Sequence, residues 1–234
     1  MSRIVVITGG NRGIGAAIAE SFIANGDTVA VFSRSGEGPT GTHGFRCDVS
    51  STESVEAAFA QLEEQLGVAE VVVANAGLTK DTLLLRMSDD DIESVINTNL
   101  IGALRIARRA AKSMLKARKG RLIFISSVVG MLGSAGQVNY AASKSGLVGA
   151  ARSIARELGG RGITANVIAP GFVDTDMTAV LSDEQKAGIV KNVPLGRYAS
   201  PQEIAGVTVF LASESASYIT GALIPVDGGL GMGH

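Results

Sequence analysis

The sequence predicts an α/β domain with a doubly wound parallel sheet, and three observations support that prediction. Short β-branched runs alternate with longer amphipathic stretches along all 234 residues. Glycines follow the first of these runs directly and open the helical stretch behind it. The length permits one full-sized domain but not two, and no Pro- or Gly-rich spacer divides the chain.

The elements follow one another in a regular order. Seven runs of about five residues have the composition of buried strands: 3–7, 28–32, 44–47, 70–74, 122–126, 164–168 and 222–226. Five stretches between them have helical spacing: 13–25, 52–66, 88–117, 140–158 and 201–212. Such alternation gives parallel strands joined by right-handed crossovers, with helices on both faces. We therefore expect one seven-stranded parallel sheet in a single domain, residues 1–234.

Charge and cysteine content exclude several classes of protein. Lys and Arg number 21 against 22 Asp and Glu, a net charge of -1, so no overall field favours a nucleic acid or a membrane surface. No run of about 18 apolar residues occurs. One cysteine, Cys47, and two histidines, His43 and His234, cannot build a disulfide framework, a Cys/His metal site or a histidine-based triad. We expect a soluble, cytoplasmic protein without a metal.

The turn after the first strand is rich in glycine. It contains Gly9, Asn11, Arg12, Gly13, Ile14 and Gly15. Glycines at such a turn let the backbone approach a pyrophosphate, whose charge is stabilised by free N–H groups at the helix N-terminus, as in dinucleotide-binding Rossmann folds. The spacing is not G-x-G-x-x-G, and no Lys-Ser/Thr pair forms a P-loop. Taken alone, the turn could also be a simple tight connection.

Side chains after the next strands favour NADP(H) over NAD(H). Ser33 and Arg34 stand where an acidic residue would bind a 2'-hydroxyl, and Arg12 could add a second cation for a 2'-phosphate. An ordinary exposed arginine is the alternative for Arg34, and the nearby Glu37 argues against a phosphate site. Further residues expected to line the crevice follow the third and fourth strands: Asp48, Val49, Asn75, Ala76 and Gly77.

A tyrosine and a lysine mark the expected reaction site. Tyr140 and Lys144 are four residues apart in a helix, which places both on one face. Ser127 ends the fifth strand, at the edge where open α/β sheets bind ligands. Taken singly, Lys144 could be a solvated helix residue, Ser127 a helix N-cap and Asn99 a group that satisfies local backbone.

These motifs together resemble the short-chain dehydrogenase/reductase family over the whole chain. The matching residues are the 8–15 turn, Asn75-Ala76-Gly77, Asn99, Ser127, Tyr140, Lys144 and Pro170-Gly171. Within the family, segments 126–130, 137–146, 169–177 and 226–229 look most like the 3-oxoacyl-acyl-carrier-protein reductases. Two features depart from the family pattern: Ala74 precedes Asn75, and the short 33–43 segment lacks the usual helix.

The resemblance implies NADPH-dependent reduction of a 3-oxoacyl group in fatty-acid biosynthesis. Tyr140 would donate the proton to the substrate oxygen, and the Lys144 charge would lower the pKa of the phenol. Ser127 would donate a hydrogen bond to the carbonyl. By resemblance, Lys144 also binds the nicotinamide ribose and Asn99 holds a water that resupplies the proton. Further cofactor contacts implied by the resemblance are Pro170, Gly171, Val173 and Thr175.

The expected partner is an acyl carrier protein. Between residues 105 and 121 there are eight basic residues and no acidic one, which could be a docking surface or only a solvated helix face. By resemblance, Arg118 and Arg161 contact the carrier near the active-site mouth, and the protein is a homotetramer. The polar stretch 172–197 would be a lid. Its apolar residues Met177, Val180, Leu181, Ile189 and Val190 would cover the acyl chain.

Two other functions stay open. The same fold and catalytic residues could reduce an acyl-CoA thioester, a polyketide or a secondary alcohol, because the motifs at the hydride site do not distinguish these substrates. A dinucleotide fold could also serve as a redox sensor without turnover. The intact set of Ser127, Tyr140 and Lys144 argues against the sensor, which has no need of a proton donor.

Overall fold

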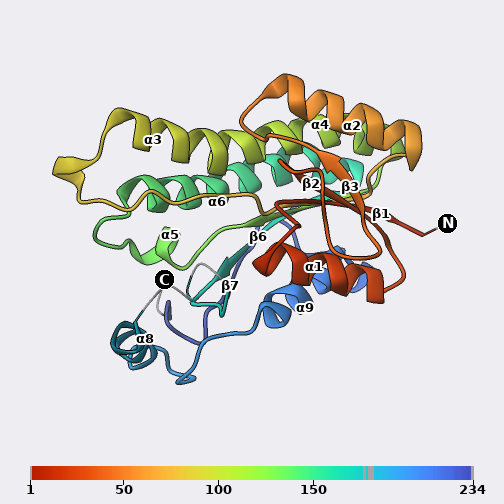
Figure 1. The fold of residues 1–234 in the computed structure, drawn as a ribbon. Coiled ribbons are helices and arrows are strands. Elements are labelled where there is room, and N and C mark those ends of the chain that lie inside the picture. Colours follow the sequence, from red (N-terminus) through yellow and green to blue (C-terminus); the bar gives the residue numbers. More distant parts are fainter. Residues whose placement is uncertain (1, 176–177, 179–181, 233–234) are drawn as a thin grey trace.

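The computed structural model describes residues 2–175, 178 and 182–232 and contains a seven-stranded sheet (Figure 1). Its order is β3-β2-β1-β4-β5-β6-β7, with every neighbouring pair parallel. The strands are β1 Ile4–Thr8, β2 Thr28–Ser33, β3 His43–Arg46, β4 Val71–Ala74, β5 Gly120–Ile125, β6 Ile163–Pro170 and β7 Leu223–Val226. Each lies within two residues of its expected place, so the predicted doubly wound parallel fold is confirmed.

Helices cover both faces of the sheet (Figure 1). One face carries α2 (Thr52–Gln65), α4 (Gly102–Ala117) and α6 (Val138–Leu158), and the other carries α1 (Gly13–Ala24) and α9 (Pro201–Ala212). Alternate strand residues enter two separate cores: Val6 and Phe124 pack under α2, α4 and α6, whereas Ile7 and Ile123 pack under α1 and α9. This division follows from the two-residue period of a strand and explains why the strands are apolar throughout.

One expected helix is interrupted. Instead of a regular helix over 88–117, the chain forms α3 (Asp89–Ile96), a π-helical turn η2 (Asn97–Ile101) and then α4. A π-turn adds a residue to the helical repeat, which the apolar spacing did not reveal. Shorter elements are α5 (Val129–Leu132) and the 3-10 turns η1 (Leu84–Arg86), η3 (Gly159–Arg161) and η4 (Glu214–Ala216).

The connection from β2 to β3 is short and contains no helix, in line with the departure seen in the sequence. The Ser33 hydroxyl organises it: it accepts hydrogen bonds from the backbone N–H groups of Gly36 and Glu37, both at 3.1 Å, and donates one to the Glu37 carbonyl at 2.9 Å. A Cβ on Gly38 would lie 2.9 Å from the Cβ of Val31. The connection therefore lies flat against the sheet.

The stretch 172–197 contains a helix that the sequence pattern did not reveal. Helix α8 (Asp183–Val190) begins with a capping box between Ser182 and Gln185. Before it, Val173 pairs with Ala199, which joins the start of the stretch to its end. Met177, Val180 and Leu181 lie outside the described residues. A lid in this stretch, and the domain limits 1–234, remain predictions.

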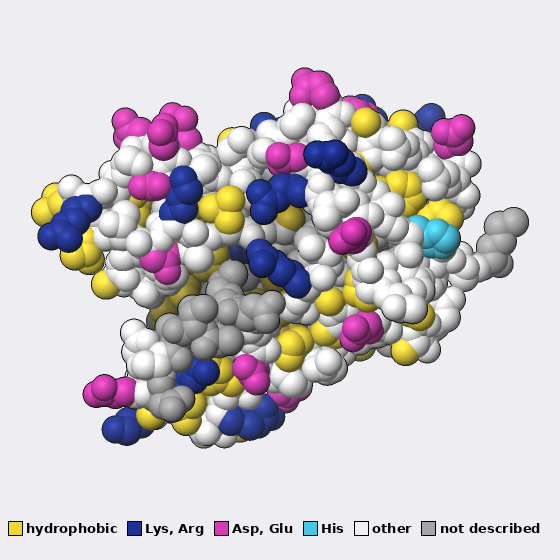
Figure 2. Space-filling model, viewed as in Figure 1, with side chains coloured by type: hydrophobic (Ala, Val, Ile, Leu, Met, Phe, Trp, Pro, Cys, Tyr) yellow, Lys and Arg dark blue, Asp and Glu magenta, His cyan; other side chains and the backbone are white. Residues whose placement is uncertain are grey.

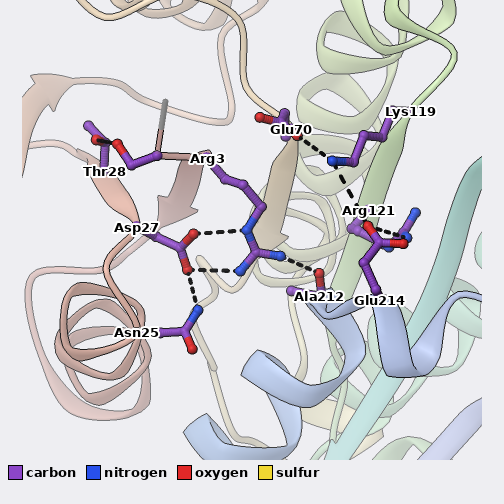
Figure 3. A network of polar contacts seen from close by, with 10 residues as sticks. Arg3, Asn25, Asp27, Thr28, Glu70, Lys119, Arg121, Ala212 and Glu214 are labelled. Atoms are coloured by element: carbon purple, nitrogen blue, oxygen red, sulfur yellow. Dashed lines mark hydrogen bonds and ion pairs between the residues drawn. The ribbon is translucent and has the colours of Figure 1, made fainter.

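Ion pairs join several elements at the amino-terminal edge of the sheet (Figure 3). Arg3 donates to both oxygens of Asp27, at 2.8 and 2.9 Å, and to the Ala212 carbonyl at 2.6 Å. Lys119 pairs with Glu70 at 3.1 Å. The first network thus joins the starts of β1 and β2 to the end of α9. The second joins the start of β4 to the turn before β5. Within the described part of the chain, no helix is both long and apolar enough to cross a membrane.

Candidate active site

The turn between β1 and α1 has a backbone that only glycine can supply. Gly9 and Gly13 have φ values of 64° and 54°, in the left-handed region. A Cβ on Gly15 would overlap the carbonyl oxygen of Gly9. The N-cap residue before α1, Arg12, makes no side-chain cap hydrogen bond within the described chain, so the first N–H groups of the helix can receive an anion.

Thr8 and Asn75 hold this turn against the end of β4. The Thr8 hydroxyl accepts from the N–H groups of Asn75 and Ala76, both at 3.0 Å. The Asn75 amide donates to the carbonyls of Thr8 and Gly9, at 3.0 and 3.1 Å. The Asn75 amide N–H groups therefore help to shape the turn, and the expectation that Asn75 lines the cofactor crevice stays a prediction.

The adenosine end differs from expectation at one residue. Ser33 is buried and its hydroxyl is fully used in the β2–β3 connection, so it is not free for a 2'-phosphate. Arg34 is exposed, and its charge helps to hold the pKa of Asp48 below the usual value, after the hydrogen bonds from Ser50. Val49 is buried and forms part of the wall under α4, where a Cβ on Gly102 would lie 2.9 Å from its side chain.

Lys144 and Asn99 meet beside Gly77 at the carboxyl-terminal edge. A Cβ on Gly77 would lie 3.2 Å from Asn99 Oδ1 and 3.5 Å from Lys144 Nζ. Lys144 is 4% exposed, and its Nζ donates to the Ile125 carbonyl at 2.8 Å. Burial lowers the pKa of Lys144 to about 8. A buried amine at the end of β5 is therefore placed where it can change its charge near neutral pH.

Tyr140 lies against the same group of side chains. Lys144 Nζ is 5.6 Å from the centre of the Tyr140 ring. Burial raises the pKa of the Tyr140 phenol, the Ser127 side chain lowers it in part, and the charge of Asp81 raises it. In this state the phenol carries its proton at neutral pH, as a proton donor requires.

The π-helical turn puts Asn99 into the site. Asn99 is 1% exposed; its Oδ1 accepts from the N–H of Leu78, and its Nδ2 donates to the Leu78 carbonyl, both at 2.9 Å. Nδ2 also donates to the Ser143 hydroxyl at 3.1 Å, which in turn donates to the Tyr140 carbonyl at 2.7 Å. The sequence analysis missed Ser143, although its place between Tyr140 and Lys144 was a usable signal.

The segment after β6 closes over the glycine turn. Val128 N–H donates to the Pro170 carbonyl at 2.8 Å, and a Cβ on Gly171 would lie 2.7 Å from the Cα of Asp227. Thr175 lies beside the turn, because a Cβ on Gly13 would be 3.6 Å from its methyl group. The buried Val173 holds this segment in place through its pairing with Ala199. The structure thus brings the predicted residues of β1, β4 and β6 to one edge.

A cavity of about 400 Å³ lies next to this segment. Its apolar lining comes from the end of β6, the return from α8, and the chain after β7. These residues include Phe172, Val193, Pro194, Leu195, Val226 and Met232. Gly231 precedes Met232 of the cavity lining, and a Cβ on Gly231 would lie 3.2 Å from the Val128 side chain. The cavity is therefore close to the residue after Ser127.

The two predicted docking arginines lie together but away from this site. Arg118 ends α4 immediately before β5, and Arg161 precedes β6, so both are at the amino-terminal edge, whereas Ser127 follows β5. The Arg118 guanidinium donates to the Gly160 carbonyl at 3.4 Å. Within one chain the pair therefore does not flank the site, because the parallel strands separate the two edges, and its role in docking stays a prediction.

The basic stretch 105–121 is not a free surface either. Arg109 donates to Glu56 at 2.8 Å and to Glu63 at 2.7 and 2.9 Å, and Arg105 donates to Asn97 at 2.8 Å. Lys112 pairs with Glu56 at 3.5 Å. On the face drawn in Figure 2, basic side chains likewise alternate with acidic ones. Two of the eight basic residues, Arg109 and Lys112, thus pair with α2 carboxylates, and docking on the rest of the stretch stays a prediction.

Comparison with known proteins gives matches over the full chain. Residues 9–231 match the family model adh_short_C2, described as Enoyl-(Acyl carrier protein) reductase. The 3-oxoacyl-[acyl-carrier-protein] reductase MabA of Mycobacterium tuberculosis is 53% identical over 100% of this chain and 95% of its own. The reductase FabG of Escherichia coli is 44% identical over 98% of each chain. A solved structure from Agrobacterium tumefaciens, described as a candidate gluconate dehydrogenase, has 32% identity and a TM-score of 0.93 over 98% of this chain and 96% of its own.

Proposed function

Since the chain belongs to the short-chain dehydrogenase/reductase family, we propose that it is an NADPH-dependent reductase of 3-oxoacyl groups carried by acyl carrier protein. The observation that supports this most is the convergence of Tyr140, Lys144 and Asn99 beside Gly77, at the edge where the glycine turn opens. A proton donor, a buried amine and a pyrophosphate cradle at one edge suit carbonyl reduction. The names of the relatives support the acyl-carrier-protein substrate.

The residues present fit a dinucleotide. The left-handed φ values of Gly9 and Gly13 shape the turn before the open N-terminus of α1, whose free N–H groups suit a pyrophosphate, and Thr175 lies beside Gly13. Arg34 and Arg12 are exposed cations for a 2'-phosphate, and the Ser33 hydroxyl shapes the connection beside Arg34. When bound, the nicotinamide supplies the hydride.

The chain's own residues then handle the proton. Tyr140 holds a proton on its hydroxyl and delivers it to the substrate oxygen as negative charge develops there. Lys144, charged below pH 8, stabilises the phenolate that remains. Ser127 donates a hydrogen bond to the same substrate oxygen. Asn99 keeps the loop after β4 against Lys144.

The positions of Arg118 and Arg161 bear on how a carrier would dock. Arg118 and Arg161 lie at the edge opposite to their own site, so we infer that they serve the site of a neighbouring copy in a homo-oligomer. Arg118 has φ 53° and is the one non-glycine residue with positive φ in the described chain. This conformation costs about 1–2 kcal/mol and is that of a left-handed residue ending a helix, since Arg118 caps α4 and its N–H donates to the Met114 carbonyl.

The decisive experiment follows NADPH oxidation with a 3-oxoacyl group on acyl carrier protein and on CoA. We expect higher kcat/KM on the carrier protein, a preference for NADPH over NADH, and a loss of the carrier advantage in Arg118→Glu. Lys116→Glu is the matched control, because it changes the charge equally near the same helix end without touching the Arg118 site. The advantage should weaken with salt.

Three results would contradict the proposal. Equal efficiency on CoA thioesters would favour another short-chain reductase. Reduction of an enoyl thioester instead of the 3-oxo compound would favour the activity in the family description. Tight NADPH binding without turnover on any ketone would favour the sensor.

A further inference from the structure

We propose that Asn139 is a positioning residue for Tyr140, because it joins the loop after β4 and the start of α3 to the first turn of α6. Sequence reasoning gave this side chain no role. The inference rests on the proposed role of Tyr140 as proton donor.

The Asn139 side chain makes three hydrogen bonds to three segments. It is 2% exposed. Its Nδ2 donates to the carbonyls of Lys80 and Asp91, both at 3.2 Å. Its Oδ1 accepts from the backbone N–H of Tyr140 at 2.7 Å. That N–H belongs to the first turn of α6, where the helix offers no carbonyl partner. A buried amide that satisfies groups of three segments gives each of them one defined place.

The loop that Asn139 holds, residues 78–82, forms one wall around Tyr140. Asn99 holds the loop at Leu78, and Asn139 holds it two residues later, at Lys80. The Thr82 N–H donates to the Gly136 carbonyl at 2.8 Å and holds the end of the loop. Asp81 lies between Lys80 and this contact. Asp81 accepts from Gln137 at 2.8 Å and acts on the phenol through its charge. Asn139 therefore holds the backbone at Tyr140 and also the 78–82 loop, whose Asp81 charge acts on the phenol.

The chemistry is sensitive to this placement. Asp81 from the loop and Ser127 from the end of β5 act on the Tyr140 phenol, and Lys144 Nζ lies 5.6 Å from the centre of its ring. Lys144 and Ser127 are held by β5, through the Ile125 carbonyl and the strand end, and not by the loop. Loss of Asn139 would shift Tyr140 relative to both, and a misplacement of about 1 Å can cost about 100-fold in rate.

The test compares Asn139→Ala and Asn139→Asp with Asn166→Ala. Asn139→Asp keeps the acceptor for the Tyr140 N–H. It replaces the donor to the Lys80 and Asp91 carbonyls with a second acceptor, which repels them. Asn166 is the matched control: it is 1% exposed and bridges the Ile219 carbonyl at 2.8 Å and the Ala222 N–H at 3.1 Å, far from Tyr140. We expect both Asn139 variants to lose about 10- to 100-fold in kcat with little change in KM or in NADPH Kd. The isotope effect with deuterated NADPH should rise as chemistry becomes slower, and Asn166→Ala should change stability alone.

A second readout does not depend on turnover. In a Tyr198→Phe/Tyr218→Phe background, ζ-13C-tyrosine NMR follows Tyr140 alone. We expect the pKa of the phenol to fall toward its ordinary value in Asn139→Ala, because the ring becomes more exposed and Asp81 moves away. An unchanged pKa, or a kcat loss no larger than that of Asn166→Ala, would overturn the inference. If the pKa of the phenol falls in Asn139→Ala but the wild-type protein reduces no 3-oxoacyl thioester, only the proposed function is overturned.

Discussion

Lys144 combines a long cationic side chain with almost complete burial. Its pKa falls from 10.5 to about 8 because burial penalises the charged form. Between these two values the unfolded chain binds a proton that the folded chain does not. Stability therefore rises as pH rises from about 8 to 10.5, and the burial of Lys144 costs most below pH 8, at about 1.4 kcal/mol for each pKa unit.

Replacing Lys144 by Met should reveal this cost. We expect the difference in unfolding free energy between Lys144→Met and the wild type to favour the variant more at pH 7 than at pH 10. Urea unfolding of the cofactor-free protein at both pH values measures it. A difference that does not change with pH would show that Lys144 keeps its ordinary pKa in the folded chain.

Tyr140→Phe should separate proton transfer from binding. Removing the hydroxyl leaves the ring in place, so we expect a loss of at least about 100-fold in kcat with NADPH binding nearly unchanged. Fluorescence titration with NADPH and single-turnover kinetics provide the two measurements. Tyr218→Phe is the control, because that side chain is fully exposed and should change neither. Lost binding with intact turnover would contradict the assigned role.

The polar contacts between helices α2 and α4, beside their shared apolar core, centre on one guanidinium. Arg109 lies 5.1 Å from the centre of the Phe59 ring and donates to Glu56 and Glu63. Its side chain is 11% exposed, so its hydrogen bonds are better protected from water than those of Lys112, at 63%. The same stretch that was considered for carrier docking therefore holds the fold together.

Arg109→Met should lower stability by about 1–2 kcal/mol, because two carboxylates lose their shared donor while one of them stays partly buried. Lys112→Met should stay within about 0.5 kcal/mol, as expected of an exposed pair. Urea unfolding of both variants at low salt checks the pair. Equal losses would mean that burial does not strengthen the Arg109 contacts.

The whole molecule shows which properties the sequence could predict. The layers were predictable because neighbouring strand residues, such as Val5 and Val6, serve opposite cores. The catalytic edge was predictable because carboxyl ends of parallel strands share one edge. The use of the Ser33 hydroxyl and the π-turn at Asn99 depend on local hydrogen bonds that no spacing encodes. The place of Arg118 at the opposite edge was not predicted, because a resemblance assigns a residue a role without giving its position in the fold.

Helix α6 has one exposed side made of small residues. Its exposed small residues follow helical spacing: Ala142, Ser145, Gly149 and Ser153. A Cβ on Gly149 would meet nothing within 4 Å in one chain. Gly149→Ala in an isolated chain should therefore stabilise the helix by about 0.5–1 kcal/mol.

In an oligomer that packs on this side, Gly149→Leu should separate the subunits while the fold stays intact. Analytical ultracentrifugation and circular dichroism measure the two effects. We expect a smaller sedimenting species with unchanged helix content. An unchanged sedimentation coefficient would place the subunit contact elsewhere.

The separation of Arg118 and Arg161 from Tyr140 also bears on the rate law. A copy that must receive its substrate across a subunit boundary loses turnover when the assembly dissociates, although its own reaction chemistry is intact. Specific activity on the carrier-bound substrate should then fall on dilution more steeply than activity on a small free ketone. The enzyme's output would depend on its own abundance as well as on that of its substrate.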